Sequence, residues 1–237
     1  REVVKDFKTF GIPVYLGYGL TECSPLVIGN NDRIELPDSV GVPLPGVEAK
    51  IINADASGVG EICVKGPMVM LGYYNDPEAT AEVLDEDGFF HTGDLGTVDE
   101  NGYYRITGRI KNVIVTKNGK NIYPEEVEYY LNKNPFVAES IVVGEDEDDE
   151  TMVTAKVFPN VEAIREKLKQ SSVSSEEVFK ALSNVVKEVN KKLPSYIKKL
   201  VVRETEFVKT TTQKIKRFAE EEKKERQEEQ EKNGKDV

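Results

Sequence analysis

The stretch GFFHTGDLGTVDENGYYRITGRIKNVIVTKNGKNIYPEEVEYYL, residues 88–131, decides the fold that we expect for this chain. Its first half alternates apolar and polar residues between glycine and asparagine turns, which predicts short β-strands. Its second half sets two β-prone runs around Asn118 and Gly119, a dipeptide suited to a two-residue hairpin turn with positive backbone angles. Pro124, followed by two glutamates, predicts the first turn of a helix. Strands followed by a hairpin and a helix indicate an α+β fold.

Upstream of this stretch the pattern changes from helical to β-rich. Apolar residues recur at helical spacing in residues 1–10, and Gly11 predicts the end of that helix. Residues 12–19 read as a short strand. Residues 34–107 consist of short alternating runs between turn residues, so we expect mainly β-structure there.

Downstream, a helix is predicted to begin at the capping box formed by Ser174 and Glu177 and to end near Pro194. The acidic run at 145–150 predicts a solvated turn, although such a run also suits a cation. Residues 218–237 are almost wholly charged or amide side chains and predict a solvated helix or a disordered tail. We also expect strands at 141–144, 152–158 and 201–208.

Composition excludes several classes of function. The 237 residues include 32 Lys and Arg against 43 Asp and Glu, a formal net charge of -11, which opposes nonspecific binding to nucleic acid. No segment approaches the roughly 18 consecutive apolar residues of a membrane span. Two cysteines far apart favour a reducing, cytoplasmic setting over a disulfide framework or a metal site. The chain starts at Arg1 without a secretory stretch, so we expect it to continue a longer protein.

Four short motifs carry the candidate chemistry. Each one alone has an ordinary structural explanation: a strand-end turn with an exposed acid, a turn-capping aspartate, a surface ion pair, and solvated lysines. Their common order along the chain is far more specific than any single match. The motifs are YGLTE at 18–22, HTGD at 91–94, Gly108 with Arg109, and KTTTQKIKR at 209–217.

This order of motifs resembles the carboxyl-terminal part of the adenylate-forming superfamily of acyl-CoA synthetases, luciferases and peptide-synthetase adenylation domains. The residues are most similar to bacterial long-chain fatty acyl-CoA ligases. The resemblance implies that residues 1–109 end a large adenylate-binding domain, with a helix-strand remnant and a distorted β-barrel. Residues 110–217 would form a small mobile α+β domain, with Lys111 as its hinge, before the tail at 218–237. A hinge of this kind needs a few residues whose backbone torsions absorb the rotation.

The same resemblance assigns roles around a nucleotide. Tyr18 would lie beside the adenine, Thr21 would bond the α-phosphate, and Glu22 would help to hold magnesium, a cation that prefers carboxylate oxygens. Asp94 would accept hydrogen bonds from the ribose hydroxyls, and Arg109 would offer its guanidinium to ribose or phosphate oxygens. His91, the only histidine, is expected to be structural.

In the small domain, Lys214 matches the catalytic lysine that bridges the acid and the α-phosphate during adenylation. Gln213 stands where many members of the family have glycine, which puts the conformation of that loop in question. Lys117, Gly119 and Lys120 match the hairpin that approaches the pantetheine of coenzyme A. A solvent-facing hairpin whose lysines discourage edge pairing is the alternative for these three.

The implied activity is that of an enzyme, an AMP-forming acid-thiol ligase. ATP and Mg²⁺ would activate a fatty acid as acyl adenylate, and coenzyme A would then take the acyl group as a thioester. The phosphate-wrapping loop of the family does not occur in this sequence, so we expect the chain alone to be inactive. Two alternatives stay open: a ligase that loads an acyl or peptidyl carrier protein, and a non-catalytic nucleotide-binding or interaction module. A homo-oligomer is compatible with the sequence.

Overall fold

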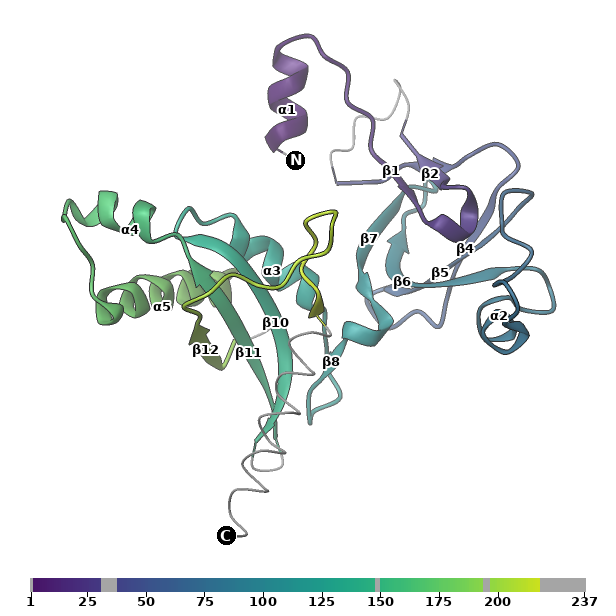
Figure 1. Ribbon diagram of the computed structural model, residues 1–237. Coiled ribbons are helices and arrows are strands. Elements are labelled where there is room, and N and C mark those ends of the chain that lie inside the picture. The colour runs from purple at the N-terminus through teal and green to yellow at the C-terminus, as the bar shows by residue number, and fades with distance from the viewer. Residues whose placement is uncertain (1, 31–37, 148–149, 194–196, 218–237) are drawn as a thin grey trace. The chain divides into compact units, whose positions relative to one another are not determined.

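The computed structural model describes residues 2–30, 38–147, 150–193 and 197–217 (Figure 1). The chain forms two compact units, Arg1–Val113 and Ile114–Val237, which we call the amino-terminal and carboxyl-terminal units. Both units combine helices with sheets, so the prediction of an α+β fold is confirmed. The distorted barrel, the mobility of the second unit and the hinge at Lys111 stay predictions.

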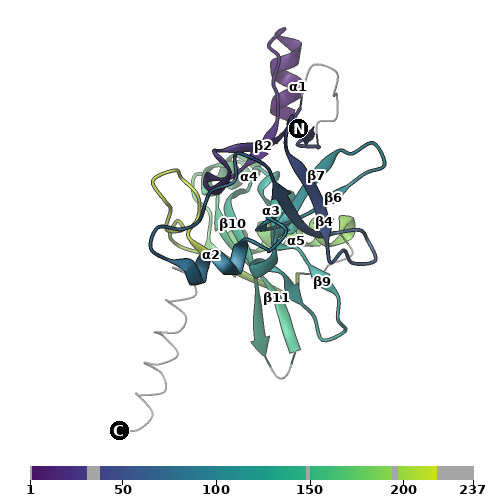
Figure 2. The same ribbon diagram turned by 90° about the vertical axis from the view of Figure 1, so that its right-hand side faces the viewer.

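The amino-terminal unit contains two antiparallel sheets. The first has the order β1-β2-β3, and the second has the order β4-β5-β6-β7. Strands β4, β6 and β7 of the second sheet are labelled in Figure 2. Gly41 and Tyr104 join the two through an isolated bridge, and a core that includes Ile28, Ile62 and Phe90 fills the interior. The strands are Gly17–Gly19, Leu26–Gly29, Val42–Pro43, Glu48–Ile52, Gly60–Lys65, Phe90–Val98 and Tyr104–Arg109 for β1 to β7.

Two expectations for this unit need correction. The strand predicted at 12–19 is paired only over Gly17–Gly19. Helix α1, which precedes it, spans Glu2–Thr9 as expected. A second helix, α2 at Pro77–Val83, was not predicted and interrupts the β-rich region. It forms because the side chain of Asp76 accepts a hydrogen bond from the amide of Ala79, and because proline occupies its first turn.

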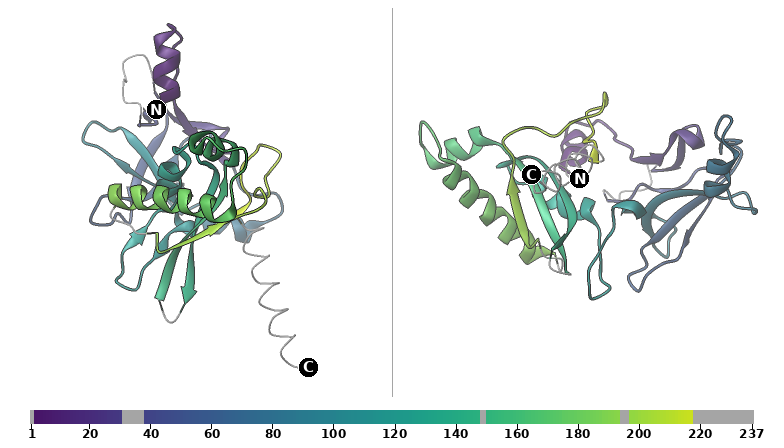
Figure 3. Two further views of the ribbon diagram at one scale, coloured as in Figure 1. Left: turned by 90° about the vertical axis from the view of Figure 1, so that its left-hand side faces the viewer. Right: turned by 60° about the horizontal axis from the view of Figure 1, so that its bottom comes forward.

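The carboxyl-terminal unit has a three-stranded sheet covered by helices. Strand β10, Val137–Glu147, pairs antiparallel with β11, Glu150–Pro159, and β11 pairs parallel with β12, Lys199–Val202 (Figure 3). Helices α3, Pro124–Asn132, and α5, Ser175–Lys192, contact each other and the sheet. Their shared core includes Val127, Leu131, Val142, Ile164, Leu182 and Val185, all nearly excluded from solvent.

The helix predicted from its capping box is confirmed. Ser174 accepts a hydrogen bond from the amide of Glu177, and the carboxylate of Glu177 accepts one from the amide of Ser174. Helix α5 ends at Lys192; Pro194 lies outside the described residues, as does the tail at 218–237. Helix α4, Val161–Leu168, was missed, although Asn160 caps it through the amide of Ala163.

Three further details differ from expectation. Strands β8, Ile114–Val115, and β9, Asn121–Ile122, are joined by a longer turn in which only Gly119 has a positive φ, +70°. Glu145 lies in strand β10 with an 11% exposed side chain bonded to Lys156, so it is not part of a solvated turn. The last strand is Lys199–Val202 and does not extend to residue 208.

Among the described residues, no helix has the length and apolar character needed to span a bilayer.

Candidate functional site

The clearest candidate site in the amino-terminal unit is the turn of residues 92–94, which we call the Asp94 turn. Gly93 has φ +67°, a conformation that suits glycine, and lets strand β6 bend here. The hydroxyl of Thr92 donates to the carbonyl of Ile62 (2.7 Å) and accepts the amide of Asp94 (3.0 Å). The backbone that leads into Asp94 is therefore held by bonds within the protein, independently of any ligand.

The carboxylate of Asp94 is held by two partners that come from distant parts of the sequence. The hydroxyl of Tyr18 donates to Oδ2 at 2.7 Å, and Nε of Arg109 lies 2.7 Å from Oδ1. Arg109 also donates to the carbonyl of Thr92 at 3.0 Å. Each carboxylate oxygen can accept two hydrogen bonds, so both oxygens of Asp94 keep acceptor capacity for a ligand hydroxyl.

Burial sets the protonation of Tyr18. It raises the pKa of the phenol far above its usual value, and the neighbouring Asp94 acts in the same direction, whereas Thr92 opposes the rise through a hydrogen bond. Tyr18 is therefore a neutral donor at physiological pH. The structure thus brings together three of the predicted nucleotide-binding residues, Tyr18, Asp94 and Arg109.

Behind the Asp94 turn lies a carboxylate that the sequence analysis missed. Oε1 of Glu61 accepts the amide of Gly93 (3.0 Å), and Oε2 lies 3.1 Å from Nδ1 of His91. Nε2 of His91 lies 3.5 Å from Asp85, so carboxylates contact both ring nitrogens. Alternation along strand β5 places Glu61 on the face opposite the core-facing Ile62, a position that reads as solvated surface, so nothing in the sequence signals its contacts.

Donor atoms of Glu61, Cys63 and His91 lie within 4.8 Å of one another, which is compatible with metal ligation. The donors, however, are engaged with one another and with the backbone. We therefore assign no metal here, and His91 keeps its structural interpretation.

Thr21 and Glu22 lie in a short 3₁₀ turn, Thr21–Cys23, directly after strand β1. The turn is anchored by the buried Cys23 and by the amide of Met70, which donates to the carbonyl of Glu22 at 2.7 Å. The hydroxyl of Tyr73 donates to Oε1 of Glu22 at 3.0 Å. The carboxylate is half-buried and can supply an oxygen ligand of the kind that magnesium prefers.

Lys214 lies in the carboxyl-terminal unit on residues 209–217, which we call the Lys214 loop. An isolated bridge between Lys209 and Ile215 closes the loop, and its tip is exposed, including Lys214. Gln213 has φ +63°, a left-handed conformation that glycine adopts without strain and that other residues rarely adopt.

Two of the four basic residues in this loop are engaged in ion pairs rather than simply solvated. Lys209 bonds Glu139 of strand β10, and Arg217 bonds Glu128 of helix α3. Burial raises the pKa of Glu128 to about 7, and Arg217 opposes that rise. Neither glutamate was singled out from sequence, because nothing local marks a carboxylate whose partner lies far along the chain.

The remaining predicted residues lie on turns. Lys111 is the middle residue of the 3₁₀ turn Ile110–Asn112. Lys117, Gly119 and Lys120 lie on the exposed turn between β8 and β9, which the hydroxyl of Thr116 closes by accepting the amide of Lys120 (3.1 Å).

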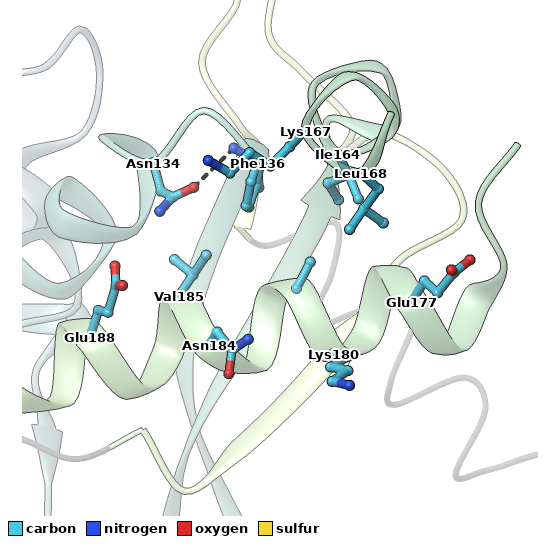
Figure 4. A pocket seen from close by; sticks show the side chains of 11 residues that line it. Asn134, Phe136, Ile164, Lys167, Leu168, Glu177, Lys180, Asn184, Val185 and Glu188 are labelled. Carbon is cyan, nitrogen blue, oxygen red and sulfur yellow. Dashed lines mark hydrogen bonds between the residues drawn. The ribbon is translucent and has the colours of Figure 1, made fainter. Parts of the chain in front are cut away.

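A cavity of about 330 Å³ lies in the carboxyl-terminal unit between helices α4 and α5 and the start of β10 (Figure 4). Apolar side chains such as Phe136, Ile164 and Leu168 line it, and Lys180 and Glu188 lie at its edge. None of the predicted site residues lines this cavity, so we do not place the chemistry there.

Comparison with known proteins agrees with the motifs. The family model described as "AMP-binding enzyme" matches residues 1–74, and the one described as "AMP-binding enzyme C-terminal domain" matches residues 111–228. A long-chain-fatty-acid–CoA ligase of Salmonella typhimurium is 46% identical over 134 residues, which are 54% of this chain and 24% of that protein. A probable 4-coumarate–CoA ligase 1 of Dictyostelium discoideum is 47% identical over 150 residues, 61% of this chain and 27% of that protein.

Solved structures match over almost the whole chain. One is o-succinylbenzoate CoA synthetase of Bacillus subtilis in complex with its acyl-adenylate intermediate, with a TM-score of 0.75 and 27% identity. The match covers 90% of this chain and 42% of that one. Another structure of that enzyme contains ATP and a magnesium ion and matches with a TM-score of 0.72. The chain spans about a quarter of the curated relatives and less than half of the solved enzyme. It belongs to the adenylate-forming AMP-binding superfamily, of which it represents the carboxyl-terminal portion.

Proposed function

We propose that this chain is part of a longer acid–CoA ligase that activates a carboxylic acid with MgATP and transfers the acyl group to coenzyme A. The observation that carries the proposal is the Asp94 turn, where a rigid carboxylate is bonded by Tyr18 and Arg109. Relatives named as CoA ligases, and a solved enzyme that holds an acyl adenylate, support the same reaction class.

On the nucleotide side, Asp94 would accept hydrogen bonds from vicinal ribose hydroxyls through its remaining acceptor positions. Arg109 has donors beyond those that it gives to Asp94 and Thr92, and these would face ribose or phosphate oxygens. Thr21 would donate to the α-phosphate, and Tyr18 would lie beside the adenine. Magnesium, when bound, supplies positive charge to the phosphate oxygens, and Glu22 would contribute one carboxylate ligand.

The acid becomes activated when its carboxylate attacks the α-phosphorus and pyrophosphate leaves. Negative charge builds up on the oxygens around phosphorus during this step. The ammonium of Lys214 would stabilise that charge more strongly in the transition state than in the ground state. AMP is then the leaving group when the thiol attacks the acyl carbon.

For the acceptor and the acid, the proposal is coenzyme A and a long-chain fatty acid. Lys117, Gly119 and Lys120 would flank the phosphorylated pantetheine, after rotation about Lys111. The long-chain substrate rests on the fatty-acid ligases among the relatives, and the coumarate ligase at similar identity makes an aromatic acid the second candidate.

The proposal is tested by acid-dependent pyrophosphate exchange of the intact protein over a panel of fatty and aromatic acids. Exchange that needs an acid establishes adenylation. Thioester formation on addition of coenzyme A, and its absence with carrier proteins, separates this ligase from carrier-loading enzymes. An intact protein that binds AMP but exchanges no pyrophosphate with any acid would favour a non-catalytic binding module.

A further inference from the structure

The Lys214 loop defines its own turn but not its direction. The amide of Thr210 donates to the carbonyl of Lys214 at 2.7 Å, and the amide of Gln213 donates to the carbonyl of Thr210 at 2.9 Å. These bonds are internal to the loop, and residues 211–214 are exposed. The place at which the Lys214 ammonium is presented must therefore be set by contacts at the two ends of the loop.

At its entry the loop is held by Glu139 of strand β10. Glu139 is bonded to the ammonium of Lys209 through Oε1, and its Oε2 accepts the amide of Phe207 at 3.2 Å. The ring of Phe207 is only 3% exposed, so it fixes this segment in the body of the unit. One carboxylate thus bonds both a side chain and a backbone amide of the incoming chain.

At its exit the loop is held by Glu128 of helix α3. Both oxygens of Glu128 bond the guanidinium of Arg217, and Oε1 also accepts the amide of Val142 at 2.6 Å. Arg217 donates in addition to the carbonyl of Val142 at 3.3 Å. The exit of the loop is therefore bonded to a helix and a strand at once.

We propose that Glu128 and Glu139 are positioning residues, which clamp the two ends of the Lys214 loop and so set where its ammonium meets the reacting phosphate. The inference rests on the role proposed above for Lys214. Hydrogen bonds between charged groups are shorter and stronger than neutral ones, and these carboxylates are only 11% and 16% exposed. A mutation far from the chemistry that misplaces a catalytic group by about 1 Å can lower the rate by about 10²-fold.

The test uses the intact protein with Glu128→Gln and Glu139→Gln, at about pH 8 so that Glu128 is ionised. Glu145→Gln is the matched control, because Glu145 is an 11% exposed carboxylate of strand β10 that bonds Lys156 and Lys199, away from the loop. We expect the rate constant of acid-dependent pyrophosphate exchange to fall about 10- to 100-fold in both clamp variants, with KM for ATP almost unchanged. Thioester formation from supplied acyl adenylate should stay at the wild-type rate, and the control should match wild type in both assays.

A second readout does not depend on activity. Amide hydrogen exchange of residues 210–216 should become faster in each clamp variant of the 237-residue chain, whereas β10 and β11 should keep their protection. The double variant E128Q/R217Q should lose no more adenylation than the worse of the single variants E128Q and R217Q, because each substitution breaks the same ion pair. Should Glu128→Gln fail to fold, Glu139→Gln carries the same test.

The outcomes separate the clamp from the function on which it rests. If Lys214→Ala leaves pyrophosphate exchange intact, the proposed role of Lys214 falls. If Lys214→Ala abolishes exchange but both clamp variants match wild type, the clamp alone is overturned. Faster amide exchange in the loop without any loss of adenylation also overturns it.

Discussion

Replacing Glu128 with glutamine should change how the stability of the carboxyl-terminal unit depends on pH. The side chain of Glu128 is 11% exposed, and burial raises its pKa to about 7 from 4.5. Arg217 and the amide of Val142 oppose this rise, and Glu125 assists it. The folded chain therefore keeps this proton to higher pH than the unfolded chain. The contribution of Glu128 to the free energy of unfolding is full below about pH 4.5 and is lost as the pH rises to about 7.

The pKa values give the size of the effect. A rise of the Glu128 pKa from 4.5 to about 7 means that the free energy of unfolding falls by an amount on the order of 3 kcal/mol between mildly acidic and mildly alkaline solution. Glutamine resembles the protonated acid, so the variant should equal wild type at low pH. It should become the more stable of the two as the pH rises, by this same amount.

The assay is urea unfolding at a series of pH values, monitored by circular dichroism. The transition that the substitution shifts is assigned to the carboxyl-terminal unit. Glu177→Gln is a control of opposite sign, because the amide of Ser174 lowers the pKa of Glu177. Its contribution is present at neutral pH and is lost on acidification. Both variants should therefore match wild type at low pH and diverge from it as the pH rises, Glu128→Gln towards higher stability and Glu177→Gln towards lower stability.

One result would refute this reasoning. If the Glu128→Gln variant became less stable than wild type as the pH rises, the pairing with Arg217 would outweigh burial. The pKa of Glu128 would then lie below its ordinary value rather than above it. The sign of the slope decides between the two, whatever its exact size.

Three other predictions concern single sites. Asp94→Asn should weaken AMP binding to the intact protein by roughly 1.5–3 kcal/mol and reduce its preference for AMP over 2′-deoxy-AMP, both measured by calorimetry; an unchanged preference would contradict the ribose contact. The left-handed backbone at Gln213 costs about 1 kcal/mol, and Gln213→Gly removes that cost, so the melting temperature should stay the same or rise; a clear fall would contradict this. Lys111→Pro should spare pyrophosphate exchange but slow thioester formation at least roughly tenfold, because proline fixes φ at the proposed hinge; equal rates in both steps would reject the hinge.

The elements that sequence predicted well are those with complete local signals. The capping box at Ser174 and the apolar spacing after it were sufficient to place helix α5. Helix α4 was missed because its eight residues bury only Ile164, too little to produce a clear period. The turn at Gly119 was assigned two residues, whereas pairing of Val115 with Asn121 makes it longer. Register depends on contacts with the rest of the sheet and not on the dipeptide alone.

The candidate site shows the same division. Motif order singled out Tyr18, Asp94 and Arg109, but it did not predict that the first would donate to the second. That hydrogen bond joins strands β1 and β6 across 76 residues of sequence. Glu61 and Glu128 were missed because a lone glutamate in a strand or helix reads as solvated surface. Their roles arise only from partners that the fold brings to them.

The contacts of His91 make it a built-in spectroscopic reporter. The chain has a single histidine, so its imidazole gives one set of ring resonances that needs neither selective labelling nor an introduced probe. Glu61 joins that ring to the amide of Gly93, next to Asp94, through its two oxygens. When an adenine nucleotide is titrated into the protein, a shift of the His91 ring resonances should report its binding at the Asp94 turn in solution. This measurement does not require the chain to be catalytically active.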